Sequence, residues 1–271
     1  MTFRSQGSEL FFTVLGEGPE VVLLHPTPVD HRFWLPVARL LAPRYRVVLP
    51  DLRGHGRSEA GAGPITVERL AADATALLDH LEIAAAFFGG CSVGGYTLFE
   101  IWRQAPARVN ALAFCCSRPG ADTAAVRSRR EQNIAKIRAG GSALYIEEQL
   151  NTLIGPTARR RSPQKIDEAR EMMQCASPAA LIAVQQGLAA RPDSLSTAGT
   201  IRVPTCVIAG GEDTSSPPAE MRLLAEELRK ASSLVEYTEI PDAGHFAPFE
   251  QPERVADLLR RCFEAARTDA P

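Results

Sequence analysis

The sequence has no long apolar segment and no strong excess of charge of one sign. Nowhere do 18 apolar residues follow one another, and residues 1–9 contain no apolar core ahead of a cleavage site. The 30 Lys and Arg residues nearly balance the 32 Asp and Glu residues, which leaves a formal net charge of −2. These features argue against a membrane span and against electrostatic binding to nucleic acid or to an anionic membrane. We therefore expect a soluble cytoplasmic protein.

The cysteines lack the spacing of a metal site. No two of the six form a CxxC pair, and most lie within apolar stretches. We predict free thiols that pack as small apolar side chains in a reducing compartment, and no bound metal. Cys91 precedes a candidate nucleophile, but we expect its side chain to point into the fold. The six are Cys91, Cys115, Cys116, Cys175, Cys206 and Cys262.

The most specific motif is a serine between small residues, at the junction of an apolar strand and a helix. Gly90, Cys91, Ser92, Val93 and Gly94 match the pattern G-x-S-x-G, which is typical of a nucleophile elbow. So sharp a turn needs small residues two before and two after the serine, because a Cβ there would collide with the crossing backbones. The turn exposes the serine Oγ. It also leaves the next backbone N–H free at a helix N-terminus, where it can stabilise an oxyanion.

A serine hydrolase also needs a histidine and a carboxylate, which follow the serine in the order acid, histidine. Asp213 lies in a polar turn after a predicted buried strand, and His245 lies in a loop after the last predicted strand. Both positions are at the carboxyl ends of strands, where open α/β sheets place their chemistry. Asp242 is the competing acid. We favour Asp213, because a carboxylate three residues before His245 is better placed to bind the N–H groups of its own loop.

Four motifs in this order resemble the α/β-hydrolase superfamily, in its branch of small serine esterases and lactonases. They are the G-x-S-x-G elbow and the segments Asp51-Leu52-Arg53-Gly54-His55-Gly56-Arg57-Ser58, Gly211-Glu212-Asp213 and Asp242-Ala243-Gly244-His245. The resemblance covers residues 10–263. It implies Ser92 as nucleophile, Asp213 as acid and His245 as base, with no organic cofactor. It also implies that residues 51–58 form a structural turn that braces the loop near the site.

One departure from the family pattern lies after the strand at residues 21–25. Proline stands at position 26, where the family usually has glycine after its histidine. Pro26 has no N–H, so the resemblance implies the backbone N–H of Thr27 as the second oxyanion donor, beside that of Val93. His25 is expected to orient this loop through its ring. The sequence leaves open whether the Thr27–Pro28 peptide bond is cis or trans.

Hydrophobic periodicity predicts an α/β fold, a mainly parallel sheet with helices on both faces. Amphipathic helical patterns alternate with apolar strand segments along most of the chain. Predicted strands lie at residues 10–14, 21–25, 46–50, 85–89, 112–117, 205–210 and 235–240.

No strand is predicted between residues 118 and 200, where only helix signals occur. Ser162-Pro163 and Ser177-Pro178 each suggest an N-cap with proline at the first helical position, whereas Gly155-Pro156 suggests a helix end. By resemblance, residues 118–200 form a helical cap inserted after the sixth strand that roofs the active site. Residues 1–117 and 201–271 then form the α/β-hydrolase core.

The predicted cap gives only weak indications of the substrate. Met172 and Met173 are weak candidates for an apolar acyl pocket, although such residues on a helix more often pack in a core. The segment 118–196 carries 12 basic and 8 acidic residues, and the arginines include Arg127, Arg129, Arg130 and Arg159–Arg161. They either solvate exposed helices or attract an acidic substrate or an acidic carrier protein.

These residues predict a serine hydrolase that cleaves a small-molecule ester or lactone through an acyl-serine intermediate. A carboxylesterase or a lactonase needs the fewest groups beyond the triad of Ser92, Asp213 and His245. A carrier-protein methyl esterase, a carbon–carbon bond hydrolase and a cofactor-free perhydrolase remain open, as does a hydrolase-shaped protein that binds a ligand without turning it over. Release of p-nitrophenol from a simple ester separates the enzymes from the last alternative.

Overall fold

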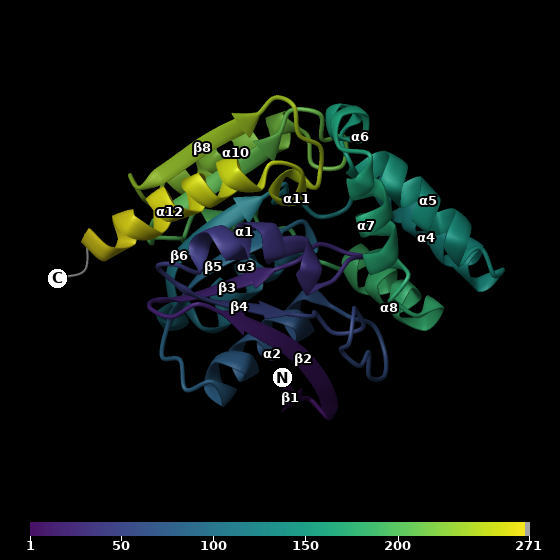
Figure 1. Cartoon of the computed structure of the whole chain (residues 1–271), viewed down its shortest axis with the longest axis horizontal. Helices are drawn as coiled ribbons and strands as arrows, with labels where there is room; N and C mark the ends of the chain where they lie inside the picture. The colour runs from purple at the N-terminus through teal and green to yellow at the C-terminus, as the bar shows by residue number, and fades with distance from the viewer. Residues whose placement is uncertain (269–271) are drawn as a thin grey trace.

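A single eight-stranded sheet organises the chain in the computed structural model, which describes residues 1–268 (Figure 1). The spatial order of its strands is β1-β2-β4-β3-β5-β6-β7-β8. Their bounds are Thr2–Ser5 (β1), Ser8–Leu15 (β2), Glu20–Leu24 (β3), Arg46–Pro50 (β4), Ala86–Cys91 (β5), Val109–Cys115 (β6), Thr205–Gly210 (β7) and Val235–Ile240 (β8).

Strands β3 to β8 are parallel to one another, whereas β2 is antiparallel to both of its neighbours, β1 and β4. This confirms the predicted mainly parallel sheet, and all seven predicted strands are present with small shifts of their ends. Strand β1 was not predicted from the sequence. It pairs with β2 through a tight turn at Gln6 and Gly7, both at positive φ, with Ser5 opposite Ser8.

Helices cover both faces of the sheet because successive strand residues point to opposite sides and both sides are buried. Val21 and Leu23 pack toward α1 and α12, whereas Val22 and Leu24 pack toward α2, α3 and α10. The helices outside the segment between β6 and β7 are η1 (His31–Trp34), α1 (Leu35–Leu41), α2 (Val67–His80), α3 (Val93–Gln104), η2 (Pro106–Arg108), α10 (Pro218–Arg229), α11 (Ala247–Glu250) and α12 (Pro252–Thr268). Within residues 1–268, no helix is long and apolar enough to cross a bilayer.

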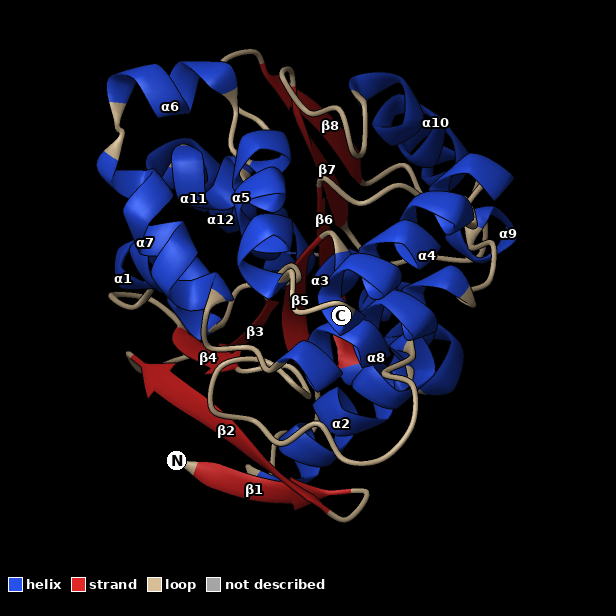
Figure 2. Cartoon of the chain, turned by 90° about the vertical axis from the view of Figure 1, so that its right-hand side faces the viewer, coloured by secondary structure: helices blue, strands red, loops and turns tan. Residues whose placement is uncertain are grey.

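The segment between β6 and β7 contains helices and no strand, as the sequence predicts. Figure 1 shows these helices gathered beyond one end of the strands. Seen from that side in Figure 2, α5 and α7 lie on one side and α4 and α8 on the other, with strands visible between them. The helices are α4 (Ala124–Arg138), α5 (Ser142–Leu153), α6 (Pro156–Arg161), α7 (Gln164–Met173), α8 (Pro178–Ala189) and α9 (Leu195–Ala198).

Two helix signals in this segment differ from the expectation. Gly155 and Pro156 follow the end of α5, and Pro156 is also the first residue of α6, a position that proline favours. Ser162 does not cap α7 with its side chain, whereas Ser177 does cap α8 by accepting the N–H of Ala180. The domain boundaries at residues 118 and 200 stay a prediction.

Helix α8 packs directly on the loop that precedes α2. The Ile65 N–H donates to the carbonyl of Ala183 at 3.0 Å. One turn further on, a Cβ built on Gly187 would lie 1.8 Å from the Ile65 carbonyl oxygen. The absence of a side chain at position 187 therefore lets the helix and the loop backbone touch.

Gly187→Ala is expected to lower the free energy of unfolding by about 1–3 kcal/mol, because the clash with the loop exceeds the gain in helix propensity. Gly120→Ala is the matched control, since its Cβ would meet only the Asp193 carboxylate at 3.7 Å. Urea denaturation of both variants measures the difference. A Gly187→Ala protein as stable as the wild type would contradict this packing.

Candidate active site

Ser92 lies on a strained turn between β5 and α3. Its φ of 52° and ψ of −115° are unusual for a residue with a side chain, and such strain is concentrated at functional sites. A Cβ on Gly90 would lie 2.4 Å from the carbonyl carbon of Gly94, and one on Gly94 would lie 2.1 Å from the Leu24 carbonyl oxygen. The crossing of strand and helix thus demands glycine at both positions.

His245 forms a buried pair with Asp213. Its Nδ1 lies 2.8 Å from Asp213 Oδ2, while Asp213 Oδ1 accepts the backbone N–H groups of Ser215 and Ser216 at 2.7 and 3.0 Å. Burial alone would raise the pKa of Asp213, but His245 and the two N–H groups outweigh it and lower that pKa. An ionised Asp213 holds the proton of His245 on Nδ1, which leaves Nε2 free to accept another.

Asp242, the competing acid, lies elsewhere. Its carboxylate pairs with Arg161 Nη1 at 3.3 Å and with Arg254 Nη1 at 3.6 Å. The structure therefore brings Asp213, and not Asp242, to the His245 ring.

The loop after β3 places Thr27 beside the cavity, and two histidines fix it. His25 Nε2 accepts the Leu52 N–H at 2.9 Å, so its Nδ1–H donates to the Pro26 carbonyl at 2.8 Å. His55 Nε2 lies 2.9 Å from Thr27 Oγ1. Burial lowers the pKa of His25 and lowers that of His55 to about 4, so both rings are neutral near pH 7. The Thr27–Pro28 peptide bond is cis.

Asp51, the first residue of the predicted bracing turn, holds the same loop. Its carboxylate accepts the backbone N–H of His31 at 2.8 Å and of Arg57 at 2.8 Å, and contacts His31 Nδ1 at 2.7 Å. Asp30, His31 and Asp51 are close enough together to be considered as metal ligands. Arg32 already engages the Asp30 carboxylate at 2.7 Å, so we interpret the group as an ion-pair cluster that fixes the loop.

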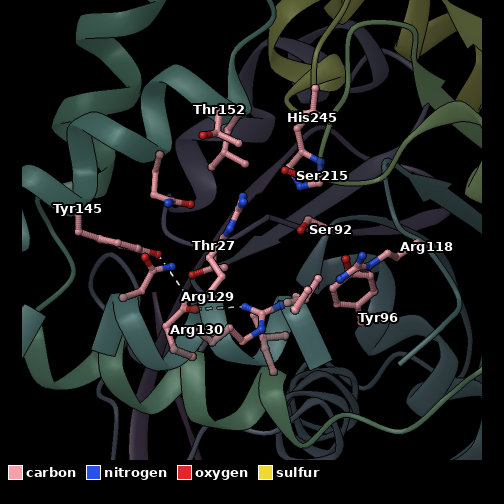
Figure 3. A pocket seen from close by; sticks show the side chains of 18 residues that line it. Thr27, Ser92, Tyr96, Arg118, Arg129, Arg130, Tyr145, Thr152, Ser215 and His245 are labelled. Atoms are coloured by element: carbon pink, nitrogen blue, oxygen red, sulfur yellow. Dashed lines mark hydrogen bonds between the residues drawn. The ribbon is translucent and has the colours of Figure 1, made fainter. Parts of the chain in front are cut away.

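A cavity of about 310 Å³ contains Ser92, His245 and Thr27 in its wall. Figure 3 shows Ser92 and His245 on one side and Tyr145, Arg129 and Arg130 on the other. Helices α4 and α5 of the segment between β6 and β7 supply much of the second side. Such a volume suits a small substrate.

Two weak candidates for substrate binding do not line this cavity. Met172 and Met173 are buried in the apolar core, because α7 turns this face toward α5. Cys91 is fully buried, with its Sγ 3.5 Å from the His245 carbonyl oxygen, and burial raises its pKa well above the usual value. Its side chain therefore points into the fold, as predicted.

Several residues of the cavity were not predicted from the sequence. Arg118, Tyr96, Tyr145 and Gln185 all line it, and none has a local motif that could identify it. Among the arginines that could attract an acidic substrate, Arg129 and Arg130 line the cavity. The others, Arg127 and Arg159–Arg161, do not.

Glu250 was also missed, although it joins the His245 loop to the start of α6. Its two oxygens accept the N–H groups of Gly244 at 2.9 Å and of Gly155 at 3.2 Å. On the other side of His245, the Phe246 N–H donates to the Leu153 carbonyl at 3.0 Å. The backbone is thus tied to the helical segment on both sides of His245.

Burial raises the pKa of Glu250 to about 7, against the opposing effect of three backbone N–H groups. The nearby carboxylate of Glu212 raises it further. Glu212 itself accepts the Thr157 N–H at 2.9 Å and the Thr157 hydroxyl at 2.5 Å. The junction between the His245 loop and α6 therefore contains two carboxylates, one of which titrates near neutral pH.

The chain belongs to the alpha/beta hydrolase family, whose model matches residues 21–258. It is 31% identical over 274 residues to a pimeloyl-[acyl-carrier protein] methyl ester esterase of Chromobacterium violaceum, which covers 96% of this chain and 99% of that protein. It is 28% identical over 262 residues to a 3-oxoadipate enol-lactonase of Acinetobacter baylyi, and the match covers 93% of this chain and 92% of that protein.

Solved structures agree with this assignment. A thermophilic esterase from Thermogutta terrifontis, determined with malate bound, has a TM-score of 0.91 and 33% identity over 98% of this chain and 97% of that one. The enol-lactonase from Burkholderia xenovorans has a TM-score of 0.89 and 27% identity over 97% of this chain and 100% of that one. The predicted family and fold are confirmed.

Glu250 is expected to make the stability of the protein fall as pH rises. Because its pKa is raised from 4.5 to about 7, the folded state binds more protons than the unfolded state in this interval. Relative to Glu250→Gln, which cannot titrate, the free energy of unfolding should decrease by up to about 3 kcal/mol between pH 4.5 and about pH 7.5. Denaturation of both proteins across this range provides the measurement, and a constant difference would disprove the shift.

Proposed function

We propose that Ser92, His245 and Asp213 form a catalytic triad that hydrolyses a carboxylic ester or lactone of a small molecule. The observation that carries this proposal is the Asp213–His245 pair, whose histidine lines the same cavity as a serine on a glycine-bounded elbow. The chain is accordingly a carboxylic ester hydrolase, in agreement with the esterases and enol-lactonases that it resembles.

The reaction begins when His245 Nε2 removes the Ser92 proton and Oγ attacks the ester carbonyl carbon. Asp213 stabilises the imidazolium that forms. The negative charge on the carbonyl oxygen is received by the N–H groups of Val93 and Thr27. Val93 is the first residue of α3, so its N–H has no partner within the helix and lies at the positive end of the helix dipole.

Collapse of this intermediate breaks the ester bond. His245 gives its proton to the leaving alkoxide, and the acyl group stays on Ser92 Oγ. Water then attacks the acyl-serine with His245 again as base, and the acid leaves as Ser92 regains its proton. In a lactone the leaving alkoxide remains part of the same molecule, so the chemistry is unchanged.

Residues 118–200 act in this proposal as a cap over the core formed by residues 1–117 and 201–271. Tyr145 and Gln185 from this segment line the cavity and are joined by a hydrogen bond of 3.1 Å. The cap therefore selects the substrate, while the core supplies the triad and the oxyanion donors.

Ser92→Ala is expected to reduce the hydrolysis of p-nitrophenyl butyrate by at least about 1000-fold, because it removes the hydroxyl that forms the acyl intermediate in this proposal. The fold should be unaffected, since the smaller side chain removes only a hydroxyl at the cavity. Ser128→Ala, an exposed serine on α4, is the matched control. A loss of less than about tenfold would refute the role of Ser92, and a wild-type protein inactive on esters and lactones would favour the ligand-binding alternative.

A further inference from the structure

Every residue with a permanent charge in the wall of the cavity is an arginine. Arg118, Arg129 and Arg130 line the cavity, and no Asp or Glu is among its lining residues in the described chain. In Figure 3, Arg118 lies beside Tyr96 on the same side as Ser92, whereas Arg129 and Arg130 lie on the other side. The remaining lining from α4 and α5 is largely neutral and polar, and includes Asn133, Gln149 and Thr152. An anion placed there would meet positive charge and hydrogen-bond donors, with no competing carboxylate in the wall.

A buried cluster behind this wall has more positive than negative charge. Asp122 Oδ1 accepts from Arg118 Nη2 at 2.9 Å and from Arg191 Nη2 at 3.1 Å, and its Oδ2 accepts from Arg130 Nε. Burial opposes ionisation of Asp122, but the three arginines outweigh it and lower its pKa. With Glu220, which forms an ion pair with Arg118, two carboxylates face three guanidinium groups, so the cluster keeps a net positive charge.

Two donors of this cluster have no acceptor. The Nε atoms of Arg118 and Arg191 are buried without a hydrogen-bond partner, and the side chains are only 11% and 2% exposed. Arg191 packs over the Tyr96 ring at 4.2 Å, so its position is fixed by that ring. Arg118 Nε lies 3.9 Å from Glu220, beyond hydrogen-bonding range. A buried donor without an acceptor is costly unless a ligand supplies one, and of these two arginines only Arg118 lines the cavity.

Arg129 is an exposed residue of α4 that lines the cavity and has no acidic partner among the described residues. No hydrogen bond or ion pair joins its side chain to any other residue between 1 and 268, although the neighbouring Arg130 bonds both Asp122 and Gln185. On the same helix, Arg138 is exposed and lies outside the cavity. Arg129 is therefore the arginine of the wall whose full hydrogen-bonding capacity is open to a ligand.

We propose that this wall binds a carboxylate of the substrate, so that the preferred ester or lactone carries an anionic group several bonds away from the carbonyl that Ser92 attacks. The planar guanidinium groups suit a carboxylate, which can accept two parallel N–H bonds from an arginine. The cavity volume of about 310 Å³ keeps the two ends of such a substrate close. This inference rests on the proposed function, because it places a carboxylate on the acyl or alcohol portion of the ester that Ser92 attacks.

The test compares two esters of equal length, mono-p-nitrophenyl adipate and p-nitrophenyl hexanoate, in which a terminal carboxylate replaces a methyl group. At one fixed ionic strength, and after subtraction of the uncatalysed rates, kcat/KM of the wild type should be at least about tenfold higher for the adipate ester. Arg129→Gln should lower this preference about tenfold, and Arg129→Lys should lower it less. Arg138→Gln, which removes the same charge from α4 outside the cavity, should leave the preference unchanged.

A binding measurement separates this inference from the proposed function. Titration calorimetry of Ser92→Ala with adipate should show binding that weakens at least about tenfold when Arg129→Gln is added. Hydrolysis of both esters without a preference, or adipate binding that does not depend on Arg129, would overturn the carboxylate site alone. Arg129-dependent adipate binding by a wild type that hydrolyses neither ester would instead overturn the proposed function.

Discussion

The close crossing of β5, α3 and the end of β3 is the constraint on which the site depends. At this crossing no side chain fits on Gly90 or Gly94, and a Cβ on Gly95 would lie 2.0 Å from Ser117 Oγ. The backbone can turn so sharply only because these positions are empty, and the turn forces Ser92 to a positive φ. Ser92 Oγ and the Val93 N–H are therefore positioned by backbone sterics, which hold them in place before substrate binds.

The second half of the site has a different support, because His245 lies on a loop. Asp213 fixes its ring, and Glu250 and the Leu153 carbonyl fix the backbone on either side of it. Since Gly155 and Leu153 belong to the helical segment between β6 and β7, that segment and the histidine loop are held together. A substitution at their junction should therefore disturb both the cavity and the geometry of the proposed triad.

The fold and the central residues could be predicted because their signals are local. A glycine-bounded serine and polar turns after apolar strands are patterns within a few residues, and the Asp213–His245 pair follows from strand order. The charged wall could not be predicted in this way. Asp122 meets Arg191 across 69 positions, and Glu250 meets Gly155 across 95, so only the folded chain brings them together. Strand β1 was missed because four residues with alternating burial carry too weak a pattern.

The most direct test of the central claim is mass spectrometry of the protein after reaction with diethyl p-nitrophenyl phosphate, a reagent that phosphorylates activated serines. The account predicts one diethylphosphoryl group per chain, located by peptide mapping on Ser92, and its absence when His245 is replaced by Gln. Modification of another residue, or equal modification of Ser92 without His245, would contradict the assignment of Ser92 as a nucleophile activated by His245.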